Sequence, residues 1–245
     1  MSRLVLFFSL LAAVSGLYAQ EGETEVHSSV CMSSRMVWRG VESSGATATG
    51  VFQFARDGWR VGADISQPFD RDEPGEGKIY AAYGWKLAKT VKLEVSACPR
   101  WLIDARPGAT KHSGEAGLSA VWELPSGFSV ELAGFYDWRL KANTLAATVN
   151  YSQPLKNLGA YLEWSATVGT SSARDLRPDA VGPAIRDSYS YYAASVRLPY
   201  RIGARSTLFG GLHVAESDGQ SRFWSPVLAS GGFHAWIDVG LSADF

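Results

Sequence analysis

The sequence predicts an all-β fold, a transmembrane antiparallel up-and-down β-barrel of about twelve strands with short periplasmic turns and long external loops. Three observations lead to this fold class. Apolar and polar residues alternate in segment after segment, short and long connections take turns between the segments, and the chain ends on an alternating segment that closes with Phe245. Side chains of a strand point alternately to its two faces, so this alternation indicates strands with one apolar face and one polar face.

The N-terminal segment has the features of a secretory signal peptide. Ser2-Arg3 is a short basic start, Leu4–Val14 is an apolar run, and small residues lead to a cleavage point after Ala19. The apolar run is too short to span a bilayer as a helix. We therefore expect residues 1–19 to be a signal peptide and residues 20–245 to form one barrel domain in the bacterial outer membrane.

Alternation with a period of two then recurs to the end of the chain. In 158–168, for example, Leu162, Trp164 and Ala166 alternate with Glu163 and Ser165. Such segments favour strands over helices. The expected strands are residues 25–39, 49–56, 59–66, 78–86, 91–98, 117–123, 128–132, 144–151, 158–168, 191–198, 205–215 and 235–245.

The lengths of the connections give the orientation of the barrel. Asp57-Gly58 is a favoured hairpin dipeptide, because both central residues of such a turn need a positive φ. Short connections of this kind alternate with longer ones, and barrels of the outer membrane have short periplasmic turns and long external loops. The longest connection, Thr170–Asp187, is expected either to fold into the mouth and narrow it or to contact partners outside.

The apolar faces of the expected strands carry many aromatic side chains, which make up 12% of the chain while charged residues make up only 19%. Indole and phenol rings prefer the interface between lipid and water, so these side chains predict two aromatic girdles that face outer-membrane lipid. A soluble β-sandwich core is the alternative for the same apolar faces. The girdle residues are Trp38, Trp59, Tyr83, Trp85, Trp101, Trp122 and Trp138.

Two further segments resemble known outer-membrane proteins. The closing strand that ends in Phe245 is similar to the terminal signature of outer-membrane barrels, which implies that the barrel-assembly machinery recognises it. Residues 28–66, with the stretch Arg35-Met36-Val37-Trp38-Arg39-Gly40 followed by a serine-containing loop, resemble the start of the TorF-type porin family. This resemblance implies a small outer-membrane barrel that acts as a channel.

The polar faces are expected to point into the lumen. By depth, Asp64, Glu131, Glu163 and Asp238 are expected nearest the middle, and arginines nearer the two ends. Such groups either filter small solutes by charge or pair with one another to stabilise a narrow, filled barrel. The predicted lining residues are Arg35, Asp64, Arg100, Glu131, Glu163 and Asp238.

The remaining residue types give little support to other chemistry. Cys31 and Cys98 fall on strands four apart and are expected to stay unpaired, because a disulfide needs Cα atoms within about 7 Å. His213 and His234 lack further ligands at metal spacing, so solvated histidines are more plausible than a metal site. Recognisable motifs for phosphates, dinucleotides or metals are absent from the sequence, and a net charge of −1 does not favour nucleic acid. We expect no cofactor and no metal.

The sequence thus predicts a porin-like channel for passive passage of small hydrophilic solutes, with a slight preference for cations from the acidic lumen. One alternative is a non-conducting structural or adhesive barrel that works through its external loops. The other is an outer-membrane enzyme, which is disfavoured because no Gly-x-Ser-x-Gly motif or Ser–His pair is evident.

Overall fold

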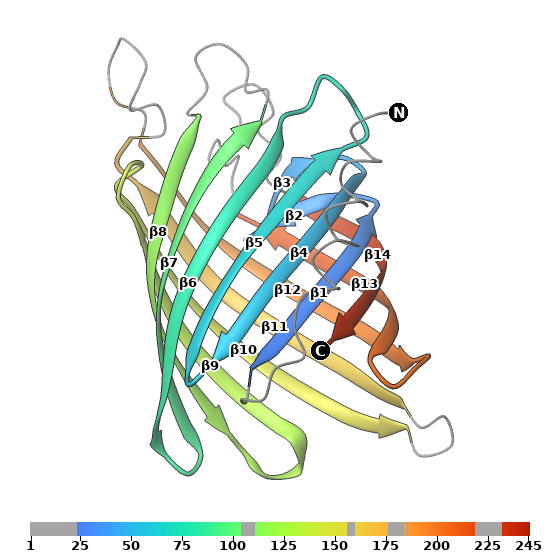
Figure 1. The fold of residues 1–245 in the computed structure, drawn as a ribbon. Coiled ribbons are helices and arrows are strands. Elements are labelled where there is room, and N and C mark those ends of the chain that lie inside the picture. Colours follow the sequence, from blue (N-terminus) through green and yellow to red (C-terminus); the bar gives the residue numbers. More distant parts are fainter. Residues whose placement is uncertain (1–23, 104–110, 156–159, 176–183, 185, 219–231) are drawn as a thin grey trace.

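The computed structural model describes residues 24–103, 111–155, 160–175, 184, 186–218 and 232–245, so the predicted signal peptide lies outside the described residues. Within this part, twelve antiparallel strands close into a barrel (Figure 1). They are β1 (Glu25–Ser33), β4 (Thr47–Arg56), β5 (Trp59–Pro68), β6 (Gly75–Ala88), β7 (Val91–Ile103), β8 (His112–Glu123), β9 (Phe128–Asp137), β10 (Ala142–Leu155), β11 (Ala160–Ala173), β12 (Asp187–Arg201), β13 (Ser206–Ser217) and β14 (Gly232–Asp244).

Every strand of the wall pairs with its sequence neighbours, and the ring closes because β1 pairs with both β4 and β14. At the closure, the amide of Val26 donates to the carbonyl of Phe245 over 3.0 Å, and the amide of Phe245 donates to the carbonyl of Val26 over 2.9 Å. A closed sheet pairs its backbone polar groups internally, which the hydrocarbon of a bilayer requires of any chain that spans it. The predicted fold class is confirmed.

The short turns lie at the end of the barrel that carries the C-terminus. Asp57 and Gly58 both have positive φ values, 50° and 83°, as the predicted two-residue turn requires. Another connection at this end is the single 3-10 turn η1 (Pro125–Gly127). We call this end periplasmic and the opposite end external.

The outer surface of the wall is apolar. Large side chains such as Leu145, Ile237 and Phe233 are more than half exposed there, which a soluble protein would not tolerate over a continuous belt. The belt requires lipid and therefore places the barrel in an outer membrane rather than in solution as a sandwich. Six of the predicted girdle residues lie exposed on this surface, namely Trp59, Tyr83, Trp85, Trp101, Trp122 and Trp138.

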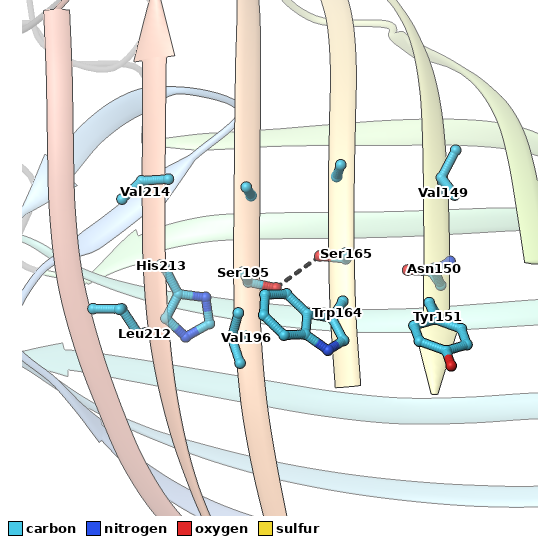
Figure 2. A pocket seen from close by; sticks show the side chains of 12 residues that line it. Val149, Asn150, Tyr151, Trp164, Ser165, Ser195, Val196, Leu212, His213 and Val214 are labelled. Carbon is cyan, nitrogen blue, oxygen red and sulfur yellow. Dashed lines mark hydrogen bonds between the residues drawn. The ribbon is translucent and has the colours of Figure 1, made fainter. Parts of the chain in front are cut away.

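The outer surface is hollowed over β10–β13. A depression of about 330 Å³ there is lined by Tyr151, Trp164 and Leu212, which Figure 2 shows, and by the small residues Ala166 and Ala194. Its lining side chains on this face are apolar and continue the lipid-facing belt. No helix of the described residues is long and apolar enough to cross a membrane.

One prediction about the wall is wrong. The first expected strand, residues 25–39, ends at Ser33, and a separate hairpin follows, made of β2 (Met36–Trp38) and β3 (Val41–Ser44). We call residues 34–46 the lumen hairpin, because its contacts described below lie inside the barrel near the external end (Figure 1). Trp38 belongs to this hairpin and is therefore not a girdle residue that faces lipid.

Candidate functional site in the lumen

The inward face of the wall is polar. The register of the ladders keeps every second residue of each strand on this face, and these are the polar residues of the alternating pattern. One row across adjacent strands runs through Asn150, Ser165, Ser195 and His213, each opposite the next. Figure 2 shows this row on β10–β13, with Ser165 and Ser195 joined by a hydrogen bond of 2.7 Å. Hydroxyl, amide and imidazole groups therefore line this side of the lumen.

The lumen hairpin crosses the external half of the barrel. Its tip is a two-residue turn, Arg39-Gly40, with positive φ values of 51° and 76°, and Trp38 pairs with Val41 across it. A Cβ on Gly40 would lie 2.6 Å from the Cβ of Tyr191 on β12, so only glycine fits both this backbone conformation and this contact. The tip therefore lies against β12 of the wall.

Arg39 attaches the tip to two wall strands. Its Nη1 donates to Oε1 of Glu115 on β8 over 2.7 Å and to Oγ1 of Thr144 on β10 over 3.1 Å, and its Nη2 reaches Oε2 of Glu115 at 3.3 Å. The guanidinium also lies 3.8 Å from the ring centre of Trp38 and 4.6 Å from that of Phe135. Such two-pronged, largely buried ion pairs fix geometry strongly.

A second buried ion pair supports the same region. Arg100 on β7 donates to Asp137 on β9 over 3.0 Å, and the two side chains are only 6% and 2% exposed. The other carboxylate oxygen of Asp137 accepts from the backbone amides of Arg139 and Leu140, which holds the external turn that follows β9. Since Arg100 also lies 5.2 Å from the ring centre of Trp38, the pair forms part of the surface under the hairpin.

The opposite side of the hairpin is attached through Glu42. Its Oε2 accepts a hydrogen bond of 3.0 Å from Arg35 and lies 3.2 Å from Nδ1 of His234 on β14. Val41, which is 1% exposed, packs beside these groups. It belongs to a buried apolar cluster whose other members come from β10, β11, β12 and the turn before β10, namely Leu140, Ala142, Ala173, Tyr189 and Tyr191. This buried cluster therefore lies at the external end of the lumen.

The periplasmic half of the lumen is hollow by comparison. One hollow of about 470 Å³, the β5–β9 hollow, is lined by Arg60, Lys92 and Glu131 among others. A second of about 600 Å³, the β9–β13 hollow, is lined by Glu163, Arg197 and polar residues of the row described above. The lumen therefore combines a narrowed external half with a wider, charged periplasmic half.

The charges of the β5–β9 hollow are largely paired. Arg60 donates to both carboxylate oxygens of Glu94 over 2.6 Å and 2.5 Å, and Lys92 pairs with Glu123. Glu131 and Lys86 line the same hollow, and no ion pair within the described residues involves either of them. The hollow therefore offers one carboxylate and one ammonium group to mobile ions.

The predicted lining residues take three kinds of position. Asp64, Glu131 and Glu163 lie on the inward face without an ion pair among the described residues, whereas Arg100 and Asp238 are inward but paired. Asp64 and Asp238 lie in the middle of their strands. Glu131 and Glu163 are each the fourth residue from the periplasmic end of their strand, which corrects the expectation that they lie at mid-depth.

Arg35 takes the third kind of position, because it lies on the lumen hairpin and not on the wall. Its partner Glu42 is on the same hairpin, so the pair belongs to the narrowed half of the lumen. The structure adds lumen residues that the sequence did not single out, above all Glu115 and Asp137. A two-residue turn signal, Arg-Gly between apolar residues, was the one feature of the sequence that could have indicated the hairpin.

Groups for covalent or metal chemistry are not assembled in the described part of the lumen. Ser195, the direct cross-strand partner of His213, hydrogen-bonds to Ser165 instead. Cys31 and Cys98 are both free thiols, as expected. The described residues contain no group of three or more His, Cys, Asp or Glu side chains placed to hold a metal ion.

Searches for related proteins show a shared fold and no family. No protein-family model and no curated protein sequence matches the chain. Among solved structures, the KdgM porin superposes with a TM-score of 0.55 at 11% identity, covering 90% of this chain and 99% of its own. The NanC porin gives 0.54 at 8% identity, covering 88% and 98%. An outer membrane channel from Pseudomonas putida F1 gives 0.51 at 9% identity, covering 93% and 97%. The TorF-type resemblance is not among these matches.

Proposed function

We propose that this barrel is an outer-membrane channel for passive passage of small hydrophilic solutes, with a slight preference for cations, and that its external half is narrowed by the lumen hairpin. The observation that carries the proposal is the polar lumen with two hollows below a hairpin that is attached to the wall at several points. The shared fold adds support, since the KdgM porin has also been solved in complex with oligogalacturonate, a hydrophilic solute.

The preference for cations follows from the carboxylates that have no ion pair among the described residues, Asp64, Glu131 and Glu163. Charged side chains that line a pore favour ions of opposite sign. In bilayers with a KCl gradient, we expect a reversal potential that indicates a slight preference for potassium. Changing both Glu131 and Glu163 to Gln is expected to bring the permeability ratio close to unity. A preference for chloride that Glu163→Gln leaves unchanged would contradict the proposal.

A non-conducting barrel is the second candidate, and the tight packing of the hairpin favours it. Val41 is almost wholly buried, and two ion pairs that are mostly buried, Arg39–Glu115 and Arg100–Asp137, support the same end of the lumen. Liposome swelling separates the two functions. Swelling that depends on solute size supports a channel, whereas vesicles that do not swell in any small sugar or amino acid support a structural barrel.

We also propose that Phe245 is part of the signal for the barrel-assembly machinery. Its side chain is exposed on the outer surface beside the closing ladder of β1 and β14, where an assembly factor could contact it before closure. Phe245→Ala is expected to reduce the amount of folded barrel in the outer membrane several-fold, as judged by heat-modifiable electrophoresis. Phe233→Ala at the external end of the same strand serves as the matched control, and an equal loss in both variants would contradict the role.

A further inference from the structure

Two opposite charges in the β9–β13 hollow face each other without pairing. Glu163 on β11 and Arg197 on β12 are direct cross-strand partners. Yet Nη2 of Arg197 donates to Oδ2 of Asp238 over 2.7 Å, although Asp238 lies two strands further along, on β14. His213 on β13 also approaches Asp238, with Nε2 3.2 Å from Oδ1. Arg197 therefore pairs with Asp238 and not with Glu163, although Glu163 is its direct neighbour in the sheet.

Gly211 explains this choice of partner. It lies between Arg197 and Asp238 in the same row of the sheet, as the residue of β13 opposite both. A Cβ at this position would be 2.2 Å from Oδ1 of Asp238 and 2.6 Å from Nε2 of His213. The missing side chain thus leaves the space in which Asp238 meets Arg197 and His213.

Two charged groups remain available to a solute as a result. No ion pair within the described residues involves Glu163. The side chain of Arg197 is 40% exposed, so N–H groups other than the Nη2 donor to Asp238 can face the hollow. The hollow of about 600 Å³ is within the range of ligand sites, roughly 300–1,000 Å³. Neutral hydrogen-bonding groups complete its lining, namely Ser129, Asn150, Ser152, Ser165 and Ser195.

We propose that the β9–β13 hollow binds small zwitterions of the α-amino-acid type, with the ammonium group at Glu163 and the carboxylate at Arg197. An ammonium group has N–H donors that a carboxylate accepts, and a guanidinium can bind a carboxylate with two parallel hydrogen bonds. Side chains directly opposite in a sheet start only about 5 Å apart, which suits the short separation of the two charges in an α-amino acid. The inference rests on the proposed channel and names a class of solute for it.

Saturation-transfer NMR on the detergent-solubilised full barrel tests the site without relying on conduction. L-Alanine is expected to bind saturably, and ethylamine and propionate, which each carry one of its two charges, are expected to bind at least several-fold more weakly. Glu163→Gln is expected to raise the dissociation constant for L-alanine about tenfold, the effect of losing one charge-assisted hydrogen bond. No saturable binding of L-alanine to the wild type would overturn the proposal, and so would equal binding of ethylamine.

The chain offers a matched control and a second variant. Glu131→Gln removes the same charge from the other hollow and is expected to leave L-alanine binding unchanged. An equal loss in Glu131→Gln and Glu163→Gln would contradict the location of the site. Gly211→Ala keeps all charges but is expected to displace Asp238, release Arg197 toward Glu163 and so weaken binding. Unchanged binding in Gly211→Ala would contradict the inference that Glu163 and Arg197 can bind a solute because Arg197 pairs with Asp238. Conductance in KCl, measured separately, decides the channel function.

Discussion

Removal of the lumen hairpin is expected to raise the single-channel conductance several-fold. Ser33 and Thr47 are register partners of β1 and β4, so residues 34–46 can be replaced by Asn-Gly, which closes two adjacent strands as a tight turn. The hairpin spans the lumen from β1 and β4 to β8, β10 and β12, and its loss would open the external half. Conductance in planar bilayers with KCl is the measurement.

The excised protein must still be a closed barrel, which heat-modifiable electrophoresis and far-UV circular dichroism establish. A control changes the exposed stretch Asp70-Arg71-Asp72 of the next external connection to Gly-Ser-Gly, and this is expected to alter conductance little. Conductance that stays at the wild-type value after excision would show that the hairpin does not limit passage.

Loss of Arg39 alone is expected to let the hairpin leave its position in the lumen far more often. Arg39→Ala leaves Glu115 largely buried without its ion-pair partner and removes the contacts with Trp38 and Phe135. Breaking a buried ion pair in this way costs about 3 kcal/mol, which corresponds to about a hundredfold increase in the fraction of displaced hairpin. Open-channel current noise and protease cleavage within residues 34–46 measure that fraction.

Arg35→Ala is the matched control for this experiment. Arg35 lies on the same hairpin and pairs with Glu42, but 45% of its side chain is exposed, and such pairs contribute little. We expect its effect on noise and cleavage to be small beside that of Arg39→Ala. Equal effects of the two variants would indicate that hairpin charge in general, and not the contact with Glu115, holds the segment in place.

The wall of the barrel could be predicted because a single physical constraint acts on every strand. Lipid outside and water inside demand apolar and polar side chains at alternate positions, so the sequence pattern and the observed faces agree for Trp59, Ile79 and Leu145. Turn chemistry supplied independent support at Asp57-Gly58, where the positive φ values match the dipeptide. These signals are local, and local signals are what a single sequence contains.

The hairpin was not predicted because the alternation of apolar and polar residues in β2 continues that of β1 without a break. Met36 and Trp38 are apolar at even positions, in step with Val30 and Met32, so nothing in the pattern marks the end of β1 at Ser33. The distinction lies in what the apolar side chains meet. Met32 faces outward and is 47% exposed, whereas Trp38 lies between Arg39 and Arg100 inside the barrel. That difference depends on strands far along the chain.

The partners of the lumen charges were also beyond sequence analysis. Alternation assigns Asp238 to an inward face, but its pairing with Arg197 depends on the missing side chain of Gly211 on the strand between them. Glu163 lies nearer to Arg197 in the register and has no ion pair within the described residues. Alternation assigns a residue to a face. It does not determine which of several charges on that face form a pair.

The contacts of the lumen hairpin have a consequence for the order of events during biogenesis. Arg39 is among the first residues of the described chain, yet its partners Glu115 and Thr144 lie 76 and 105 positions later. Contacts that join distant parts of a chain form late, since the intervening loop must close first. The hairpin is therefore expected to dock only after β8 and β10 are in place, so that the lumen is wider during assembly than after the N-terminal segment has narrowed it.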